Sequence, residues 1–264
     1  MSNPFTLLSG RGIKLLPFGD EGCGKTDLAS GVRKLTTRYL YIDNEGSTSA
    51  VSLAAYDKTT HCGLLMLTAQ SAQSVTKLLE DGLVAARAGK PWWDVVVLDS
   101  FVEQQETRSG QIAVERAKAN PKESPQALSE AGWGDLRRDL LTLLRLCVAL
   151  ADTGCGVIVT TAADLEDDPL RPGTKEVRPY CQGSVRFLLG KFFDLVIYVK
   201  NDSNKENPSR HLYHMLRVGN FRHKNRYERQ WIGLKFPAVL ENPDLPQLLD
   251  YIHKADKEAN RDNA

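Results

Sequence analysis

Short apolar runs alternate along the chain with longer stretches in which apolar residues recur at helical spacing. The short runs predict β-strands, and the stretches between them predict helices. The predicted strands are Ile13–Phe18, Tyr39–Asp43, Gly63–Leu67, Val95–Asp99, Gly156–Thr161 and Leu195–Lys200. The predicted helices are Lys25–Leu35, Ser71–Ala88 and Leu136–Ala151. Because this alternation is typical of βαβ units, we expect an α/β fold with a mainly parallel sheet and helices on both faces.

The pattern changes after Lys200, where a polar segment precedes two further apolar runs. His211–Val218 and Arg229–Phe236 predict late antiparallel strands that extend one edge of the sheet. Two long connections separate the predicted elements: Glu103–Gly132 is charged and partly helical, and Ala163–Leu188 carries several prolines and glycines. Connections of this length are usually functional or mobile.

The composition fits one globular domain over residues 1–264, in which only the polar tail, residues 253–264, is expected to fray. The chain is 42% hydrophobic and 25% charged, which excludes a disordered or fibrous protein. Its five cysteines are scattered without C-x-x-C spacing, so neither a disulfide framework nor a zinc site is predicted. The chain shows no apolar run of membrane-spanning length and no secretory signal, so we expect a cytoplasmic protein without a membrane partner.

A glycine-rich segment between the first predicted strand and helix fits the phosphate-binding pattern G-x-x-x-x-G-K-[ST]. Its backbone N–H groups and the following helix N-terminus would surround the phosphates of an ATP-like triphosphate. Lys25 would reach the β and γ phosphates, and the Thr26 hydroxyl would bind Mg²⁺. The predicted nucleotide-binding residues are Gly19, Asp20, Glu21, Gly22, Cys23, Gly24, Lys25, Thr26 and Asp27.

Asp99, at the end of the predicted strand Val95–Asp99, is the candidate carboxylate for the same magnesium ion. Thr26 and Asp99 are therefore the predicted metal residues. Ser100 follows Asp99, whereas many ATPases of the AAA+ type have a glutamate there to position the attacking water. The carboxylate for hydrolysis must come from another part of the chain.

Glu45 lies just beyond the second predicted strand, in the segment Tyr-Leu-Tyr-Ile-Asp-Asn-Glu-Gly, and here the sequence resembles the RecA-like ATPases. In that family a glutamate after the strand that follows the P-loop helix orients the attacking water. The resemblance therefore implies that Glu45 is catalytic, while Glu103 and Glu106 remain rival bases.

From about Ile13 to Phe236 the chain resembles the short RecA-like ATPases of tailed phages, which are found beside recombination genes. The matching segments, in order, are the P-loop, IDNEG, VVVLDS, GWGDLRRDLLTLL, VIVTTA and FFDLVIYV. The resemblance implies a three-layer RecA-like P-loop NTPase that hydrolyses ATP with Mg²⁺ and acts with single-stranded DNA. It also implies single-strand-binding or other recombination proteins as partners.

Family members often carry a histidine or glutamine at the end of the VIVTTA strand to sense the γ phosphate. Thr161, Ala162 and Ala163 occupy that region here, which leaves the rate of hydrolysis open. Thr160 or Thr161 is the remaining hydroxyl donor.

Lys224-Asn-Arg226 has the K-x-R spacing with which RecA-like motors complete the active site of the next subunit. The resemblance implies that this pair acts in trans, in a ring or filament of identical subunits. The predicted catalytic residues are Glu45, Lys25, Lys224 and Arg226. The alternative is that Lys224 and Arg226 belong to a solvated basic loop.

The net charge of +1 requires that any nucleic acid be bound by a local basic patch. One candidate combines basic residues with aromatic ones, namely Arg210, His211, His214, Arg217, Arg222, His223, Lys224, Arg226 and Arg229 with Tyr213, Phe221, Tyr227 and Trp231. This set is typical either of a single-strand platform or of a solvated edge and subunit interface. A second candidate comprises Arg171, Lys175, Arg178 and Arg186, of which Arg178 and Arg186 are foremost.

Two other functions remain open at this point. The chain would be a nucleotide-gated binding module if it holds ATP but hardly hydrolyses it. A P-loop also serves small-molecule kinases, although no arginine-rich lid of the usual form is visible.

Overall fold

The computed structural model describes residues 3–46, 48, 52–66, 72–167, 173–207, 209–216 and 222–262. Within these residues, nine strands form one sheet in the order β11-β9-β8-β1-β5-β4-β2-β3, with β10 paired to β8. The separate strands β6 and β7 form a two-stranded antiparallel sheet. The strands are β1 (Lys14–Gly19), β2 (Tyr39–Asp43), β3 (Gly63–Met66), β4 (Val95–Asp99), β5 (Gly156–Val159), β6 (Ala163–Asp167), β7 (Lys175–Pro179), β8 (Leu195–Asn201), β9 (His211–His214), β10 (Lys224–Asn225) and β11 (Val239–Glu241).

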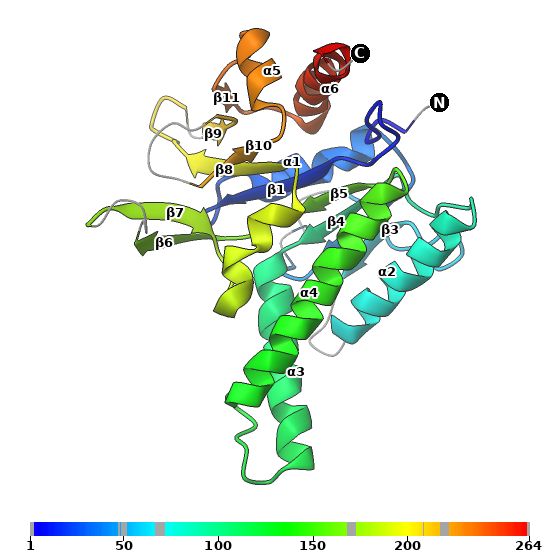
Figure 1. Cartoon of the computed structure of the whole chain (residues 1–264), viewed down its shortest axis with the longest axis vertical. Coiled ribbons are helices and arrows are strands. Elements are labelled where there is room, and N and C mark those ends of the chain that lie inside the picture. The colour runs from blue at the N-terminus through cyan, green and yellow to red at the C-terminus, as the bar shows by residue number, and fades with distance from the viewer. Residues whose placement is uncertain are drawn as a thin grey trace.

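Helices cover both faces of the large sheet, because its inner strands bury alternate side chains on opposite sides. Leu16 and Phe18 of β1 pack under one helical layer, whereas Leu15 packs under the other. The α2–α4 layer lies on one side and α1, α5 and α6 lie on the other (Figure 1). The helices are α1 (Lys25–Ser30), α2 (Ala72–Arg87), α3 (Phe101–Ala119), α4 (Glu130–Asp152), α5 (Glu228–Gly233) and α6 (Leu245–Asp262), with 3-10 turns η1 (Gly31–Lys34), η3 (Gly183–Phe187) and η4 (Leu189–Phe192).

The predicted α/β class, with a mainly parallel sheet and late antiparallel edge strands, is confirmed. Strands β1, β2, β3, β4, β5 and β8 run parallel, while β9 and β11 are antiparallel to their neighbours. Because the parallel strands share one direction, β1, β2 and β4 end at the same edge of the sheet. Gly19, Asp43 and Asp99 therefore lie at that edge, which is the usual place for a ligand in this class of fold.

The helices α3 and α4 form a hairpin whose far end projects from the body of the molecule (Figure 1). The predicted long connection Glu103–Gly132 is thus mostly the helix α3, which begins directly after β4. At the tip, Arg116 forms ion pairs with Glu123 at 2.7 Å and with Asp135 at 2.8 Å. These contacts hold the two helices together where they have left the sheet.

One prediction for the C-terminal third was wrong. Arg229–Phe236 is not a strand: it contains most of α5, because Trp231 is fully buried against Phe236 and donates its indole N–H to the Pro237 carbonyl at 2.8 Å. The tail that is predicted to fray, residues 253–264, lies in α6 as far as Asp262, and Ala255 is buried. The short strand β11 forms the edge of the sheet instead.

Two further segments differ from the prediction in detail. The predicted helix Lys25–Leu35 is divided into α1 and the 3-10 turn η1. The long connection Ala163–Leu188 holds the β6–β7 hairpin and η3. None of the helices formed by the described residues has both the length and the apolar composition required to cross a membrane.

Candidate nucleotide-binding site

The glycine-rich loop leaves β1 and turns into α1 with the backbone that a phosphate cradle requires. Gly24, at the N-cap of α1, adopts φ 90° and ψ 13°, a left-handed conformation that favours glycine. Gly19 allows close approach, because an added Cβ there would lie 2.1 Å from the carbonyl oxygen of Val199. The loop can thus place its N–H groups and the N-terminus of α1 toward one point.

Lys25 lies across this loop. Its Nζ donates to the carbonyl oxygens of Gly19 and Asp20, both at 2.8 Å. The side chains of Asp20, Glu21 and Asp27 are exposed, so the backbone is the part of these residues that shapes the loop. A lysine held at the loop mouth is placed to balance the charge of phosphate oxygens.

The side chain of Cys23 is buried inside the loop, with 1% of its surface exposed. Its Sγ lies 3.5 Å from Lys25 Nζ, and burial raises the pKa of the thiol. A buried thiol with a raised pKa is unreactive, so Cys23 fills the turn.

Asp99 accepts hydrogen bonds from hydroxyl groups on three different elements. Thr26 of α1 donates to Asp99 Oδ2 at 2.9 Å, and Tyr41 of β2 donates to the same oxygen at 2.6 Å. Thr160, just after β5, donates to Asp99 Oδ1. The carboxylate is 1% exposed, and these hydroxyls fix its orientation beside Thr26.

The sequence did not indicate Tyr41 as part of the site. The signal was present, because Tyr41 and Asp43 alternate along β2 with residues that pack into the opposite core. The Tyr41 hydroxyl reaches Asp99 because β4 lies beside β2, in a register that pairs Asp43 with Asp99.

Glu45 is carried by a loop that a buried carboxylate organises. Asp43 Oδ1 accepts the backbone N–H groups of Glu45 at 2.9 Å and Gly46 at 2.8 Å, and Oδ2 accepts that of Thr48 at 3.0 Å. Although much of Glu45 is exposed, burial of its carboxyl end raises its pKa, and the nearby Asp99 acts in the same direction. Glu45 is thus a carboxylate with increased basicity beside the loop.

These residues line one cleft of about 620 Å³. Its lining residues are Gly19, Glu21, Gly22, Cys23, Gly24, Lys25, Thr26, Asp27, Asn44, Glu45, Val102, Glu103 and Ala162. Glu103 remains a rival base because it faces the same cleft, where burial raises its pKa. Glu106 does not line the cleft.

The donor set fits a nucleoside triphosphate with magnesium. The loop amides and Lys25 suit phosphate oxygens, and a hydroxyl beside a carboxylate offers the hard oxygen ligands that Mg²⁺ prefers. Thr26 and Asp99, at 2.9 Å from each other, would hold the metal. The threonines after β5 are already engaged, since Thr161 donates to the Tyr180 carbonyl at 2.9 Å, and Ala162 is the residue there that lines the cleft.

Lys224 and Arg226 lie far from this cleft in the same chain. β10 pairs with the first residues of β8, so both side chains belong to the edge of the sheet opposite the phosphate loop. Lys224 Nζ donates to the carbonyl oxygens of Gly190 and Lys191, and Arg226 pairs with the buried Asp194 at 2.9 Å. A role for this pair at the nucleotide requires a second copy of the chain.

The foremost basic residues predicted to meet DNA are neutralised. Arg178 pairs with Glu166 at 2.9 Å and with Glu176 at 2.8 Å, and Arg186 also pairs with Glu166 at 2.9 Å. In the other candidate segment, Arg210 and Arg222 form ion pairs with acidic residues as well. Several predicted members, namely Arg171, Arg217 and Phe221, lie outside the described residues.

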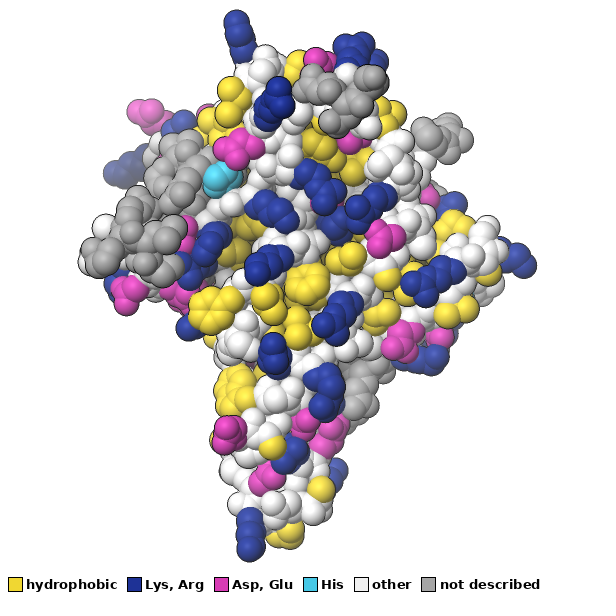
Figure 2. Space-filling view, viewed as in Figure 1, with side chains coloured by type: hydrophobic (Ala, Val, Ile, Leu, Met, Phe, Trp, Pro, Cys, Tyr) yellow, Lys and Arg dark blue, Asp and Glu magenta, His cyan; other side chains and the backbone are white. Residues whose placement is uncertain are grey.

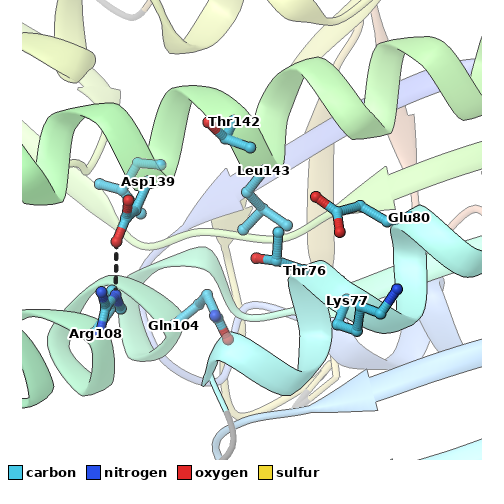
Figure 3. Close-up of a pocket in the computed structure, with 9 residues that line it drawn as sticks. Thr76, Lys77, Glu80, Gln104, Arg108, Asp139, Thr142 and Leu143 are labelled. Atoms are coloured by element: carbon cyan, nitrogen blue, oxygen red, sulfur yellow. Dashed lines mark hydrogen bonds and ion pairs between the residues drawn. The ribbon is translucent and has the colours of Figure 1, made fainter.

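A second cleft, of about 270 Å³, lies between α2, α3 and α4 (Figure 3). Arg108 donates to Asp139 across it at 2.7 Å, as Figure 3 shows, and Lys77 and Glu80 line the opposite side. Its lining charges balance, and none of the described residues that line it is a glycine. The cleft at the phosphate loop is therefore the candidate nucleotide site, and the Arg108–Asp139 pair is a contact that joins α3 to α4.

Comparison with known proteins shows which family the chain matches. Residues 11–229 match the family described as AAA domain. A crystal structure of a KaiC-like protein from the hyperthermophilic archaeon Pyrococcus horikoshii is similar at 15% identity, with a TM-score of 0.40, over 81% of this chain and 83% of that one. No curated protein matches the chain.

Proposed function

The chain belongs to the AAA domain family, and from this premise we propose that it binds ATP with Mg²⁺ at Gly19–Thr26 and hydrolyses it. The observation that carries the proposal is the hydrogen bond between Thr26 and Asp99, 2.9 Å long, directly beneath the phosphate loop. It brings together two residues that are distant in sequence and have the chemistry of a magnesium site. Glu45 and Lys25 line the same cleft.

Each side chain has a separate task in this proposal. The loop amides and Lys25 bind the phosphates and oppose the charge that develops during γ-phosphoryl transfer. Bound Mg²⁺ would supply further positive charge. Glu45 orients the attacking water and accepts its proton, for which a raised pKa is suitable at neutral pH. The buried Tyr41 and Thr160 hydroxyls keep Asp99 directed toward Thr26.

The finer part of the proposal concerns partners. We propose that the ATPase acts with single-stranded DNA in phage-type recombination or replication, supported by the resemblance to short RecA-like phage ATPases. We further propose a homo-oligomer in which Lys224 and Arg226 of one subunit approach the nucleotide of the next. Their distance from their own phosphate loop supports an arrangement in trans.

A second candidate is a nucleotide-gated module that binds ATP and hydrolyses it very slowly. The observation in its favour is that Ala162, after β5, lines the cleft, while the hydroxyls of Thr160 and Thr161 already donate to protein oxygens. Among the three residues that directly follow β5, Thr160 donates its hydroxyl to Asp99 and Thr161 donates to the Tyr180 carbonyl, so neither hydroxyl is placed to report the γ phosphate. Slow turnover with tight ATP binding would identify this function.

ATP turnover measured with and without single-stranded DNA, beside the Lys25→Ala variant, tests the proposal. We expect Mg²⁺-dependent turnover that DNA stimulates and that the variant lacks. Turnover that persists in Lys25→Ala would show that the activity does not arise from this cleft. DNA-independent turnover by a monomer would retain the ATPase and remove the proposed partners.

A further inference from the structure

The outer side of α4 carries exposed aromatic and basic side chains next to η3 and η4. Trp133 of α4 is 41% exposed and Phe187 of η3 is 60% exposed. Figure 2 shows this side of the molecule, where Lys and Arg side chains alternate with hydrophobic ones and few acidic side chains lie among them. Large exposed aromatic residues that are grouped with unpaired cations indicate a binding surface.

The cations on this surface are available, unlike those of the β6–β7 hairpin. Arg137 and Arg145 of α4 and Lys191 of η4 are exposed and form no ion pair with any described residue. Arg137 follows Trp133 by one helical turn, so the two side chains are neighbours on α4. The surface therefore offers free positive charge directly beside an aromatic face.

An apolar pocket of about 240 Å³ opens between the first turns of α4 and η3. Its lining residues are Trp133, Gly134, Leu136, Arg137, Leu140, Gln182, Gly183, Ser184 and Val185. The indole of Trp133 forms one wall, since an added Cβ at Gly183 would lie 3.8 Å from its ring. A flat ring can stack on such a wall while its polar edge meets Gln182 and Ser184 at the rim.

We propose that this α4–η3 surface binds single-stranded nucleic acid, with a base stacked on Trp133 in the pocket and phosphates beside Arg137 and Lys191. The inference rests on the proposed single-strand partner and names the residues that would bind it. Free cations complement the phosphates, and an aromatic wall accepts any base because every base has a flat apolar face. An acidic protein would match the charge but would leave the aromatic pocket without a suitable ring.

The surface is joined to the nucleotide cleft through α3. The backbone N–H of Gln182, on the pocket rim, donates to Gln105 Oε1 at 3.0 Å, and the Cys181 thiol donates to the same oxygen at 3.1 Å. Gln105 is fully buried in the first turns of α3, where Glu103 lines the nucleotide cleft. A nucleic-acid strand bound at the pocket would thus contact Gln182, which is hydrogen-bonded to the helix that lines the candidate ATP site.

The test compares binding of fluorescein-labelled oligothymidylate by fluorescence anisotropy in the full-length chain and its variants. Trp133→Ala is expected to weaken binding about tenfold or more through lost stacking. Arg137→Ala is expected to weaken it and to reduce the slope of log K against log salt by about 1, as loss of one phosphate contact requires. The matched controls Ile232→Ala and Arg229→Ala change exposed residues of α5, in the rival basic segment, and should bind as the wild type does.

Equal binding by all four variants would overturn the assignment of the surface and leave the proposed partner intact. A loss confined to the α5 variants would overturn it in favour of the rival segment. Failure of the wild type to bind either oligothymidylate or oligouridylate would remove the single-strand partner itself, while ATP titration still tests the nucleotide site separately. If polyglutamate bound instead, and Trp133→Ala abolished that binding, the surface would be a site for an acidic protein.

Discussion

The sequence predicts a ligand site at the phosphate loop and nucleic-acid contacts at two basic segments, but the structure gives the residues of these regions different surroundings. At the phosphate loop, Thr26 and Asp99 come within 2.9 Å of each other, as their motifs predict. In the β6–β7 hairpin, Arg178 is instead buried between Glu166 and Glu176. A site that the backbone encodes is thus readable from a short motif, whereas the availability of a charge depends on partners that the motif does not contain.

The largest expected effect is that of Lys25→Ala at the loop. Removing the cation that faces the phosphates should lower ATP turnover about a thousandfold, because both binding and charge stabilisation are lost. A steady-state phosphate-release assay measures this, with circular dichroism to verify the fold. Lys77→Ala, at an exposed lysine that pairs with Asp81 on the surface of α2, is the control and should turn over like the wild type.

Arg178→Ala tests the opposite half of the comparison. The variant removes the cation that Glu166 and Glu176 share, while Arg186 still pairs with Glu166 and Arg222 with Glu176, so the free energy of unfolding should fall by about 2 kcal/mol. Urea denaturation measures the change. Arg145→Ala, at an exposed arginine that forms no ion pair within the described part of the chain, should stay within about 0.5 kcal/mol of the wild type. An equally small effect of Arg178→Ala would show that its ion pairs do not stabilise the chain.

Glu45→Gln keeps the size of the side chain but removes its basicity. We expect turnover to fall about a hundredfold with ATP affinity unchanged, as for loss of a general base. Because burial raises the pKa of Glu45, its carboxylate forms at higher pH than an ordinary glutamate's, so wild-type turnover should decline as pH falls through that raised pKa. The variant should lose this acidic limb of the pH–rate profile.

An unchanged rate in Glu45→Gln would transfer the role of base to Glu103, which lines the same cleft. The corresponding Glu103→Gln variant should be close to wild type if Glu45 is the base. Measuring both variants therefore decides between the two carboxylates that the sequence left open.

The smallest expected effect is that of Tyr41→Phe. The variant removes the hydroxyl that donates to Asp99 at 2.6 Å and keeps the ring that fills the core. The Mg²⁺ concentration needed for half-maximal nucleotide binding should rise about tenfold, because the metal carboxylate loses one orienting contact. Tyr39→Phe, in the same strand, is the control. The Tyr39 hydroxyl accepts the Ala54 N–H at 3.1 Å, so its removal should leave that Mg²⁺ concentration unchanged.

Much of the fold could be predicted from the sequence because the strands are short apolar runs with clear ends. Tyr39–Asp43 and Val95–Asp99 have the predicted bounds, and both end in the carboxylates that build the site. The segment around Trp231 is predicted to be a strand but forms the short helix α5, which packs on α6, because its apolar residues suit either structure. Nothing local distinguishes these two outcomes.

The site was predictable only where one residue type has one task. Gly24 and Lys25 could be predicted because a phosphate loop requires these residue types. Tyr41 could not, because its partner Asp99 lies 58 residues further along the chain. The ion pairs that neutralise Arg178 are closer in sequence but depend on the register of the β6–β7 hairpin. Charge patterns alone therefore do not identify a nucleic-acid surface.

The central claim is that the loop from Gly19 to Thr26 binds a nucleoside triphosphate together with Mg²⁺. Isothermal titration of the purified chain with ATP, in the presence and absence of Mg²⁺, tests it most directly. The account predicts saturable binding at one site per chain that Mg²⁺ strengthens and Lys25→Ala abolishes. Absence of heat and of competition by any nucleoside triphosphate, in a folded sample, would contradict it.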